Sequence, residues 1–396
     1  MSNDSSQPPE EELDPIVLTD VVSIATATGG TRGKGSRTAV ATTAAVAVAV
    51  AVIGAGTYLG TQNHSTHNST VDAAGVAATA SITTTPVAGG GDYDVFIAAA
   101  GGDEIATLNS QTGTPGLTYK SDSAMGIALT PNDQTLYVAN TGQYGVLSVN
   151  VATRAETTIQ VGAYPQDVAV SPSGATVYAT LTGGDTGPGG SNQVAVIDTA
   201  TNTLTGKITV GSAPRQIVLS TDGSRAYVST DQGIYVIDTA TNQVAGVVKA
   251  PTDVQGLALS PDGSTLYATA PDEDEVLQIL TRNLHVGRPY KAGAEPWSVG
   301  VSTDGTKLYV ADTNSNSVAV IDTQNGHTLA NVTVGSLPTA IGVTPDGSEV
   351  WVANTLTGSL SVISTASNTL AATIPGGPGT SALDSAPTDI VFAPAS

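Results

Sequence analysis

The chain has 396 residues, of which 34 are acidic and 13 basic, and its net charge at pH 7 is −21. Nucleic acids are bound by basic surfaces, so this balance argues against a nucleic-acid partner. The chain contains no cysteine, which excludes disulfides and thiolate catalysis.

Residues 1–37 are predicted to form a disordered cytoplasmic tail. Within it, the apolar stretch LDPIVLTDVVSI at 13–24 has the composition of a peptide that folds on a partner. An inert tail is the alternative. The sequence thus allows a cytoplasmic partner at 13–24 without requiring one.

The segment 38–60 is uncharged and consists mostly of Ala and Val. As a helix it would be about 34 Å long, which is enough for the bilayer core. Three basic residues precede it: Arg32, Lys34 and Arg37. No Lys or Arg follows until Lys120, so the positive-inside rule predicts a single-pass helix with a cytoplasmic N-terminus. A signal peptide cleaved near 54–56, followed by secretion, is the alternative.

Residues 61–91 are rich in Thr, Ala, Ser and Gly, a composition typical of a flexible stalk. Beyond them, one sequence repeat occurs seven times across 92–396, and each copy has an aromatic residue in its predicted second strand. These residues are Phe96, Tyr137, Tyr178, Tyr227, Tyr267, Tyr309 and Trp351. A period of about 40–45 residues is typical of four-stranded propeller blades, which bury their apolar faces only against one another. The sequence predicts an all-β, seven-bladed β-propeller with these aromatic rings in its core.

The two ends of the repeat region are complementary. The first copy, at 94–100, has no short strand before it, and the chain ends in 386–394, which matches the opening strand of a copy. We therefore expect the C-terminal strand to complete the N-terminal blade, which removes the open edges of the ring.

Two kinds of turn recur in the copies. Segments such as SPDG at 260–263 are typical of tight turns, because Pro presets φ and Gly accepts a positive φ. An Asp ends the predicted third strand in several copies. We expect Asp198, Asp238 and Asp322 to cap backbone N–H groups of the following turn.

The repeated phrases resemble the YVTN family of seven-bladed propellers, which includes YncE-like and lactonase-like proteins. The resemblance is carried by LYVANTG (136–142), SPDGSTLY (260–267), LYVADTN (308–314), VWVANTL (350–356) and VIDTATN (196–202 and 236–242). It implies a scaffold and assigns no catalytic residue. Blade 1, at 98–104, and blade 5, at 270–280, depart most from the pattern.

Propeller topology predicts that the loops between second and third strands and the loops between blades share one face. Two of these loops are long and Gly-rich, at 183–192 and 376–387. Loops on a rigid scaffold commonly carry function. The candidate ligand-binding residues on this face are Tyr164, Arg215, Asp231, Asp272, Trp297 and Asp312.

The sequence predicts no catalytic residues, no metal site and no cofactor. The acidic run at 271–275 lacks the alternation of a dedicated calcium loop and is better interpreted as a solvated turn. Of the four His, two lie on the stalk and two in different blades, so they do not form a shared metal site.

Three functional hypotheses follow. The first is a membrane-anchored extracytoplasmic propeller that binds a protein, a peptide or a cell-envelope glycan on its loop face. The second is a lactonase-like or other hydrolase that uses carboxylates at the channel mouth, with or without a divalent cation. A third has the tail relay a signal from the propeller. Converging titratable side chains in the channel would favour the enzyme.

Overall fold

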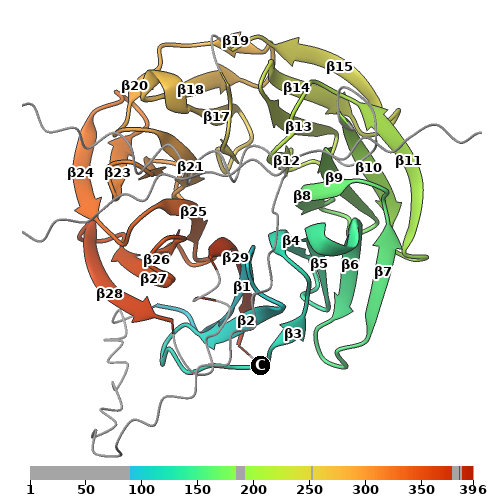
Figure 1. The fold of residues 1–396 in the computed structure, drawn as a ribbon. Coiled ribbons are helices and arrows are strands. Elements are labelled where there is room, and N and C mark those ends of the chain that lie inside the picture. The colour runs from blue at the N-terminus through green and yellow to red at the C-terminus, as the bar shows by residue number, and fades with distance from the viewer. Residues whose placement is uncertain (1–89, 184–191, 251–252, 377–382, 384–385, 396) are drawn as a thin grey trace, which may run out of the picture. The chain divides into compact units, whose positions relative to one another are not determined.

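The computed structural model describes residues 90–183, 192–250, 253–376, 383 and 386–395. They belong to one compact unit and form a closed ring of seven β-sheets (Figure 1). The predicted tail and membrane helix, and nearly all of the predicted stalk, lie outside the described residues. Within the described part of the chain, no helix is both long and apolar enough to cross a membrane.

Each sheet is one antiparallel blade. For each blade the strands are given below from the centre of the ring outward, so the strand given first lines the centre (Figure 1). Blade 1 contains β29 (Pro387–Pro394), β1 (Tyr93–Ala99), β2 (Glu104–Asn109) and β3 (Tyr119–Lys120). Blade 2 contains β4 (Ala124–Leu129), β5 (Thr135–Asn140), β6 (Gly145–Asn150) and β7 (Glu156–Gln160). Blade 3 contains β8 (Tyr164–Val170), β9 (Thr176–Thr182), β10 (Gln193–Asp198) and β11 (Thr203–Thr209).

The remaining blades follow the same plan. Blade 4 contains β12 (Ile217–Leu219), β13 (Arg225–Thr230), β14 (Gly233–Asp238) and β15 (Gln243–Val248). Blade 5 contains β16 (Leu257–Leu259), β17 (Thr265–Ala270), β18 (Glu275–Leu280), β19 (His285–Val286) and β20 (Tyr290–Lys291). Blade 6 contains β21 (Pro296–Val301), β22 (Lys307–Asp312), β23 (Ser317–Asp322) and β24 (Thr328–Thr333). Blade 7 contains β25 (Pro338–Val343), β26 (Glu349–Asn354), β27 (Ser359–Ser364) and β28 (Thr369–Pro375).

Blades 1 and 5, which depart most from the sequence pattern, have irregular outer strands. In blade 5 the outer strand is divided into β19 and β20, and both pair with β18. Pro289 lies in the gap and has no N–H to donate to a strand ladder. In blade 1 the outer strand β3 has only two residues. The only described helices are two short 3₁₀ turns, η1 (Thr141–Gln143) and η2 (Pro271–Glu273).

The predicted closure of the ring is confirmed. Strand β29 pairs antiparallel with β1, from Tyr93 opposite Pro394 to Ala99 opposite Pro387. The last strand of the chain is therefore the innermost strand of the first blade. Ile390 of β29 packs with Trp351 of blade 7, so the shared blade also joins the core of its neighbour.

The repeated aromatic residues form the core between blades, as predicted. None of the seven is more than 4% exposed. Two of the buried hydroxyl groups are hydrogen-bonded: Tyr137 donates to Asn202 Oδ1 at 2.9 Å, and Tyr178 donates to Asn242 Oδ1 at 3.1 Å. Each of these two tyrosines thus reaches from its own blade into the turn of the next.

The predicted turns are also confirmed. The N–H of Thr201 donates to Asp198 Oδ1 at 2.9 Å, and Thr241 makes the same bond to Asp238. These hydrogen bonds lower the pKa of both aspartates. Five glycines of the tight turns have φ between 67° and 74°, a conformation that glycine adopts without a Cβ penalty: Gly174, Gly223, Gly263, Gly305 and Gly347.

Candidate functional site

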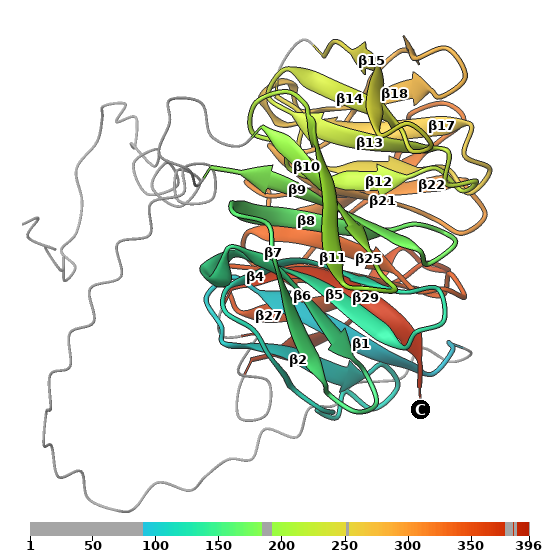
Figure 2. The same cartoon turned by 90° about the vertical axis from the view of Figure 1, so that its right-hand side faces the viewer.

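One face of the ring carries both kinds of predicted loop. Backbone hydrogen bonds join the inter-blade loops to the second-to-third-strand loops, for example from Thr141 N to Ser123 O and from Asp231 N to Ser212 O. The same pairing joins Asn314 to Ala294 in blade 6. We call this side the loop face and the opposite side, which carries the tight turns, the turn face. The loop face is toward the viewer in Figure 1 and on the left in Figure 2.

Tyr164 forms an aromatic pair on the loop face. Its ring centroid lies 4.7 Å from that of Tyr144, and the two hydroxyl oxygens are 3.1 Å apart. Tyr144 follows η1, has a φ of 53° and is 43% exposed. The hydrogen bond with Tyr144 is the main cause of the raised pKa of Tyr164. The sequence predicts Tyr164 but not Tyr144 as a site residue, because the two tyrosines belong to different blades.

Arg215, in the loop before β12, and Asp231, in the loop after β13, both lie near Asp253 in the loop between blades 4 and 5. Arg215 forms an ion pair with Asp253, whose other carboxylate oxygen accepts from Gln255 Nε2 at 2.8 Å. Burial raises the pKa of Asp253 and the Arg215 charge opposes that rise, while the charge of Asp231 raises it further. Asp231 itself accepts a hydrogen bond from Ser212. The arrangement holds a half-buried guanidinium and two carboxylates at the loop face.

Asp272, Trp297 and Asp312 belong to blades 5 and 6 and differ in exposure. Asp272 lies in η2 and is exposed. Trp297 is half-buried at an irregularity in the pairing of β21 with β22, where Pro296 is opposite Asp312. The six predicted residues therefore fall into three separate groups around the ring, and a common role in ligand binding stays a prediction.

Asp312 is fully buried rather than displayed on the loop face. The loop backbone at Gly293 passes so close that a Cβ there would lie 2.6 Å from Asp312 Oδ2. Neither carboxylate oxygen of Asp312 has a hydrogen-bond partner among the described residues. Burial is the main cause that raises the pKa of Asp312 to about 7, and longer backbone contacts oppose it. The carboxyl group is thus uncharged at mildly acidic pH.

Two carboxyl groups that the sequence analysis missed line the central channel. Asp167 of β8 and Asp389 of β29 occupy equivalent positions in innermost strands, each just before the strand's apolar run. Asp167 accepts from the N–H of Ile217 at 2.9 Å, and Asp389 accepts from the N–H of Ile127 at 2.9 Å. Each therefore ties its own blade to the innermost strand of the next.

These channel carboxyls influence one another across blade 2. Burial is the main cause that raises the pKa of Asp167 to about 8, and the Asp389 charge raises it further. Burial also raises the pKa of Asp389 to about 6. Gly126 holds the equivalent position between them, and a Cβ there would lie 2.4 Å from Asp167 Oδ1. Glycine is required because the Asp167 carboxylate occupies that space.

A comparison of the repeats could have found this pair. At the position before the apolar run, the seven copies carry Asp389, Gly126, Asp167, Gln216, Gly256, Ser298 and Ala340. Only two of the seven copies carry an aspartate at this position of the innermost strand, so Asp167 and Asp389 are exceptions to the repeat. Among the described residues, no three His, Cys, Asp or Glu side chains gather as metal ligands.

Comparisons with solved structures match the fold. Hydrazine synthase of Kuenenia stuttgartiensis is similar with a TM-score of 0.62 and 20% identity, over 68% of this chain and 92% of that one. A functionally unknown protein of Desulfotomaculum acetoxidans is similar with a TM-score of 0.62 and 12% identity, over 76% of this chain and 98% of that one. At these identities the likeness concerns the fold alone. No curated protein matches the chain.

The sequence also matches a protein-family model. The model describes a choice-of-anchor I domain and covers residues 126–330, just over half of the chain. The matched part runs from the innermost strand of blade 2 to the outer strand of blade 6. The chain belongs to the choice-of-anchor I domain family.

Proposed function

We propose that this protein is a membrane-anchored, surface-associated binding module built from YVTN-type, YncE-like repeats. The helix predicted at 38–60 holds it in the membrane, the propeller is extracytoplasmic, and the loop face binds a protein, a peptide or a cell-envelope glycan. Membership of the choice-of-anchor I domain family supports the proposal of a surface-associated module. Residues 13–24 offer a site for a cytoplasmic partner, and secretion after cleavage near 54–56 is the alternative to the anchor.

The observation that carries the binding proposal is the aromatic pair formed by the exposed Tyr144 and the half-buried Tyr164. The repeated aromatic side chains are buried between blades, whereas these two rings lie at the loop face, held against each other. Tyrosine is enriched in binding sites because it offers a large rigid surface together with a hydroxyl group. The pair is therefore a preorganised contact for a ligand.

The position where the described chain begins supports the anchor geometry. Gly91 donates its N–H to Asp346, which belongs to a tight turn on the turn face. Strand β1 then runs toward the loop face, where β29 begins at Pro387. Both described ends, at Tyr93 and Pro394, therefore lie at the turn face, and the C-terminal end is marked there in Figure 2. The described chain thus begins on the side of the ring opposite the loop face.

Replacement of both Tyr144 and Tyr164 by Ala is expected to weaken retention of the full chain on cell-envelope preparations at least tenfold. The reason is that two preorganised aromatic contacts are lost, each of which typically contributes more than about 1 kcal/mol at an interface. Leu329→Ala is the matched control, since Leu329 is also exposed but lies on the outer strand β24. Equal retention of the tyrosine double variant and the control would rule out this face as the binding side.

A hydrolase is the second candidate, favoured by one observation. Two carboxyl groups with raised pKa, Asp167 and Asp389, line the channel, as a general acid paired with a carboxylate would. If this is the function, the full chain hydrolyses lactones or esters, and Asp167→Asn lowers kcat at least a hundredfold. Turnover that is unaffected by Asp167→Asn would remove the channel carboxyls from the chemistry. Absence of turnover across a lactone and ester panel would leave them a structural role.

A further inference from the structure

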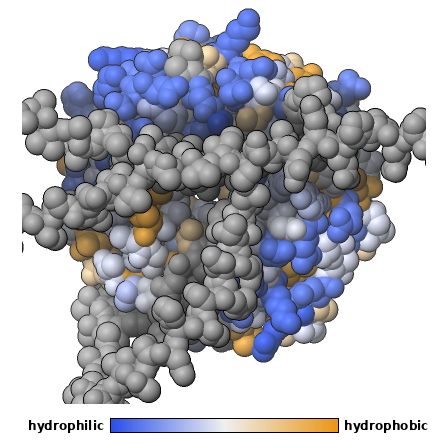
Figure 3. All heavy atoms as spheres, in the orientation of Figure 1, coloured by the Kyte–Doolittle hydropathy of each residue, from blue (hydrophilic) through white to orange (hydrophobic). Residues whose placement is uncertain are grey.

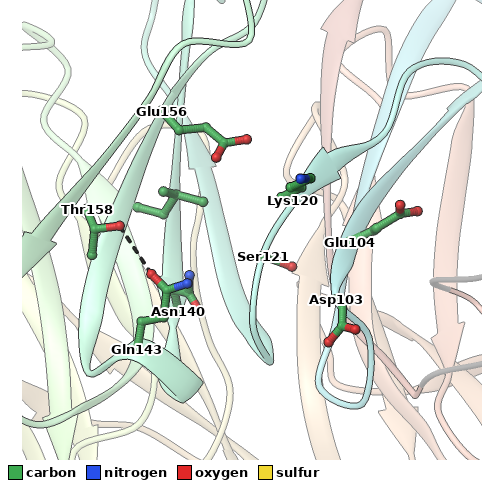
Figure 4. A pocket seen from close by; sticks show the side chains of 9 residues that line it. Asp103, Glu104, Lys120, Ser121, Asn140, Gln143, Glu156 and Thr158 are labelled. Carbon is green, nitrogen blue, oxygen red and sulfur yellow. Dashed lines mark hydrogen bonds between the residues drawn. The ribbon is translucent and has the colours of Figure 1, made fainter.

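A cleft of about 350 Å³ lies between blades 1 and 2 and opens at the loop face. Its two walls are shown in Figure 4, with Asn140, Gln143, Glu156 and Thr158 on one side and Lys120, Ser121, Glu104 and Asp103 on the other. Leu147, which is buried, completes the lining. The volume is at the lower end of the range for small-molecule sites.

Two polar side chains inside this cleft are buried without a partner. Asn140 is fully buried, and its Oδ1 accepts from the N–H of Asp122 at 3.1 Å. That bond orients the amide, and Asn140 Nδ2 is left with no hydrogen-bond partner among the described residues. The same holds for Ser121 Oγ, whose residue is 8% exposed. Buried polar groups are nearly always hydrogen-bonded, so these two groups require a partner that the protein itself does not supply.

An equivalent residue in another blade differs in which amide atom is satisfied, because the Oδ1 of Asn354 has no partner among the described residues whereas its Nδ2 has two. Asn354 ends β26 as Asn140 ends β5, and it is also fully buried. In blade 7, however, the Nδ2 atom donates to Ser359 Oγ at 3.2 Å and to Ser361 Oγ at 3.0 Å. In blade 2 those positions are Gly145 and Leu147, which offer no side-chain acceptor. The Nδ2 donor of Asn140 therefore lacks the internal acceptors that the Nδ2 donor of Asn354 has.

The charges of the lining restrict the ligand. Three carboxylates, of Asp103, Glu104 and Glu156, surround the opening with one ammonium, of Lys120. An anion is repelled by this excess of negative charge. A bare metal cation would leave the Asn140 donor unsatisfied. A hydroxyl group both accepts from a buried donor and donates to a carboxylate, so a molecule with several hydroxyl groups satisfies both parts of the cleft.

We propose that the cleft between blades 1 and 2 binds a single neutral sugar ring, with Asn140 Nδ2 and Ser121 Oγ as donors to its hydroxyl oxygens and the rim carboxylates as acceptors. This inference rests on the proposed binding function, and it names the ligand class for one site on the loop face. Leu147 supplies the small apolar surface against which the ring's C–H groups pack. Lys120 lies opposite Glu104 in the β2–β3 pairing, and this register places both side chains at the rim.

The test uses the full chain with glucose, galactose, mannose and N-acetylglucosamine at millimolar concentrations, followed by saturation-transfer NMR and thermal shift. At least one sugar is expected to bind and to raise Tm. Glucuronate, which adds a carboxylate to the same ring, is expected to bind at least tenfold more weakly than glucose. Asn140→Ala and Ser121→Ala are each expected to weaken sugar binding about tenfold or more, since each removes a buried hydrogen bond.

Asn354→Ala is the matched control, because it truncates an equally buried Asn far from the cleft and should leave sugar affinity unchanged. No signal from any of the sugars, or equal affinity in the Asn140, Ser121 and Asn354 variants, would overturn the proposal. Envelope retention of the same variants separates the two levels of inference. If sugars fail to bind while the chain is still retained on envelopes, the cleft assignment falls and the binding module stands. If retention is absent as well, both fall.

Discussion

A chain that ends at residue 384 is expected to lose cooperative folding. It lacks all of β29, which pairs along its length with β1 and forms the innermost strand of blade 1. Ile390 and Ala393 are buried in two different core clusters, and Phe392 packs against Trp351. Loss of one large buried side chain typically costs about 2–5 kcal/mol, and the total stability of a domain is about 5–15 kcal/mol. Removal of several at once exceeds that margin.

The measurement is thermal unfolding followed by circular dichroism and by near-ultraviolet signals of the buried aromatic residues. The control is a chain that ends at residue 394, because β29 ends at Pro394 and stays intact there. Addition of a synthetic peptide spanning 386–396 to the shortened chain is expected to restore part of the native signal by strand addition. If the chain ending at 384 unfolds with the Tm of the full chain, the closure does not stabilise the ring.

Stability is expected to fall as pH rises from about 5 to about 8.5. In the folded ring the pKa of Asp167 is raised to about 8 and that of Asp389 to about 6, both above the ordinary value of 3.8. The folded state therefore binds more protons than the unfolded chain between these values. The stability that depends on protonation of this pair is fully present below about pH 4 and is lost as pH rises through 6 and 8. Asp312, with its pKa raised to about 7, acts in the same direction.

The opposite dependence holds in acid. Hydrogen bonds from turn hydroxyl and N–H groups lower the pKa of Asp222 and of Asp304 to about 2. The stabilisation from these turns is present above about pH 4 and is lost as pH falls through 2. The two trends together place maximum stability near pH 4–6.

The full chain is expected to lose Tm as pH rises from 6 to 8.5, and Asp167→Asn is expected to make this fall in Tm several degrees smaller. The reason is that the substitution removes the channel carboxyl group with the higher pKa. Each oxygen of the Asp167 carboxyl group accepts one backbone N–H, and the amide NH2 of Asn cannot accept such a bond, so Tm at pH 5 is expected to fall. For this reason the slope, rather than Tm at one pH, is the diagnostic quantity. Asp272→Asn, at an exposed turn, is the control and should preserve the slope. An unchanged slope in the Asp167 variant would show that the channel pair does not control the pH dependence.

The sequence predicts most of the fold because the fold is repetitive. The recurring aromatic at positions such as Tyr137 and Trp351 indicates the period and the core, and the unmatched strand at 386–394 indicates how the ring closes. Each of these inferences uses local pattern alone. The divided outer strand of blade 5 was not predicted, because the departure from the pattern at 270–280 lies before it and its break near Pro289 depends on tertiary pairing.

The candidate site was less accessible to sequence analysis. Asp167 and Asp389 are far apart in the chain and meet only because the ring closes, so no local motif marks them. Asp312 was assigned to the loop face from its place at a strand end, whereas the close approach of Gly293 buries it. The cleft is recognised only through what Asn140 does not contact. Unsatisfied groups are a property of three-dimensional surroundings, and a sequence lists only the groups themselves.

The shared blade has a mechanical consequence. The described chain begins at the turn face, and β1 runs from there toward the loop face between β29 and β2. If the proposed anchor precedes residue 90 and the proposed ligand is held at the loop face, tension between them would act along the axis of β1. The strand would be loaded in shear, so that its hydrogen bonds to both neighbours resist together rather than open one after another. Closing the ring with the last strand of the chain thus reinforces the strand through which such a load would enter.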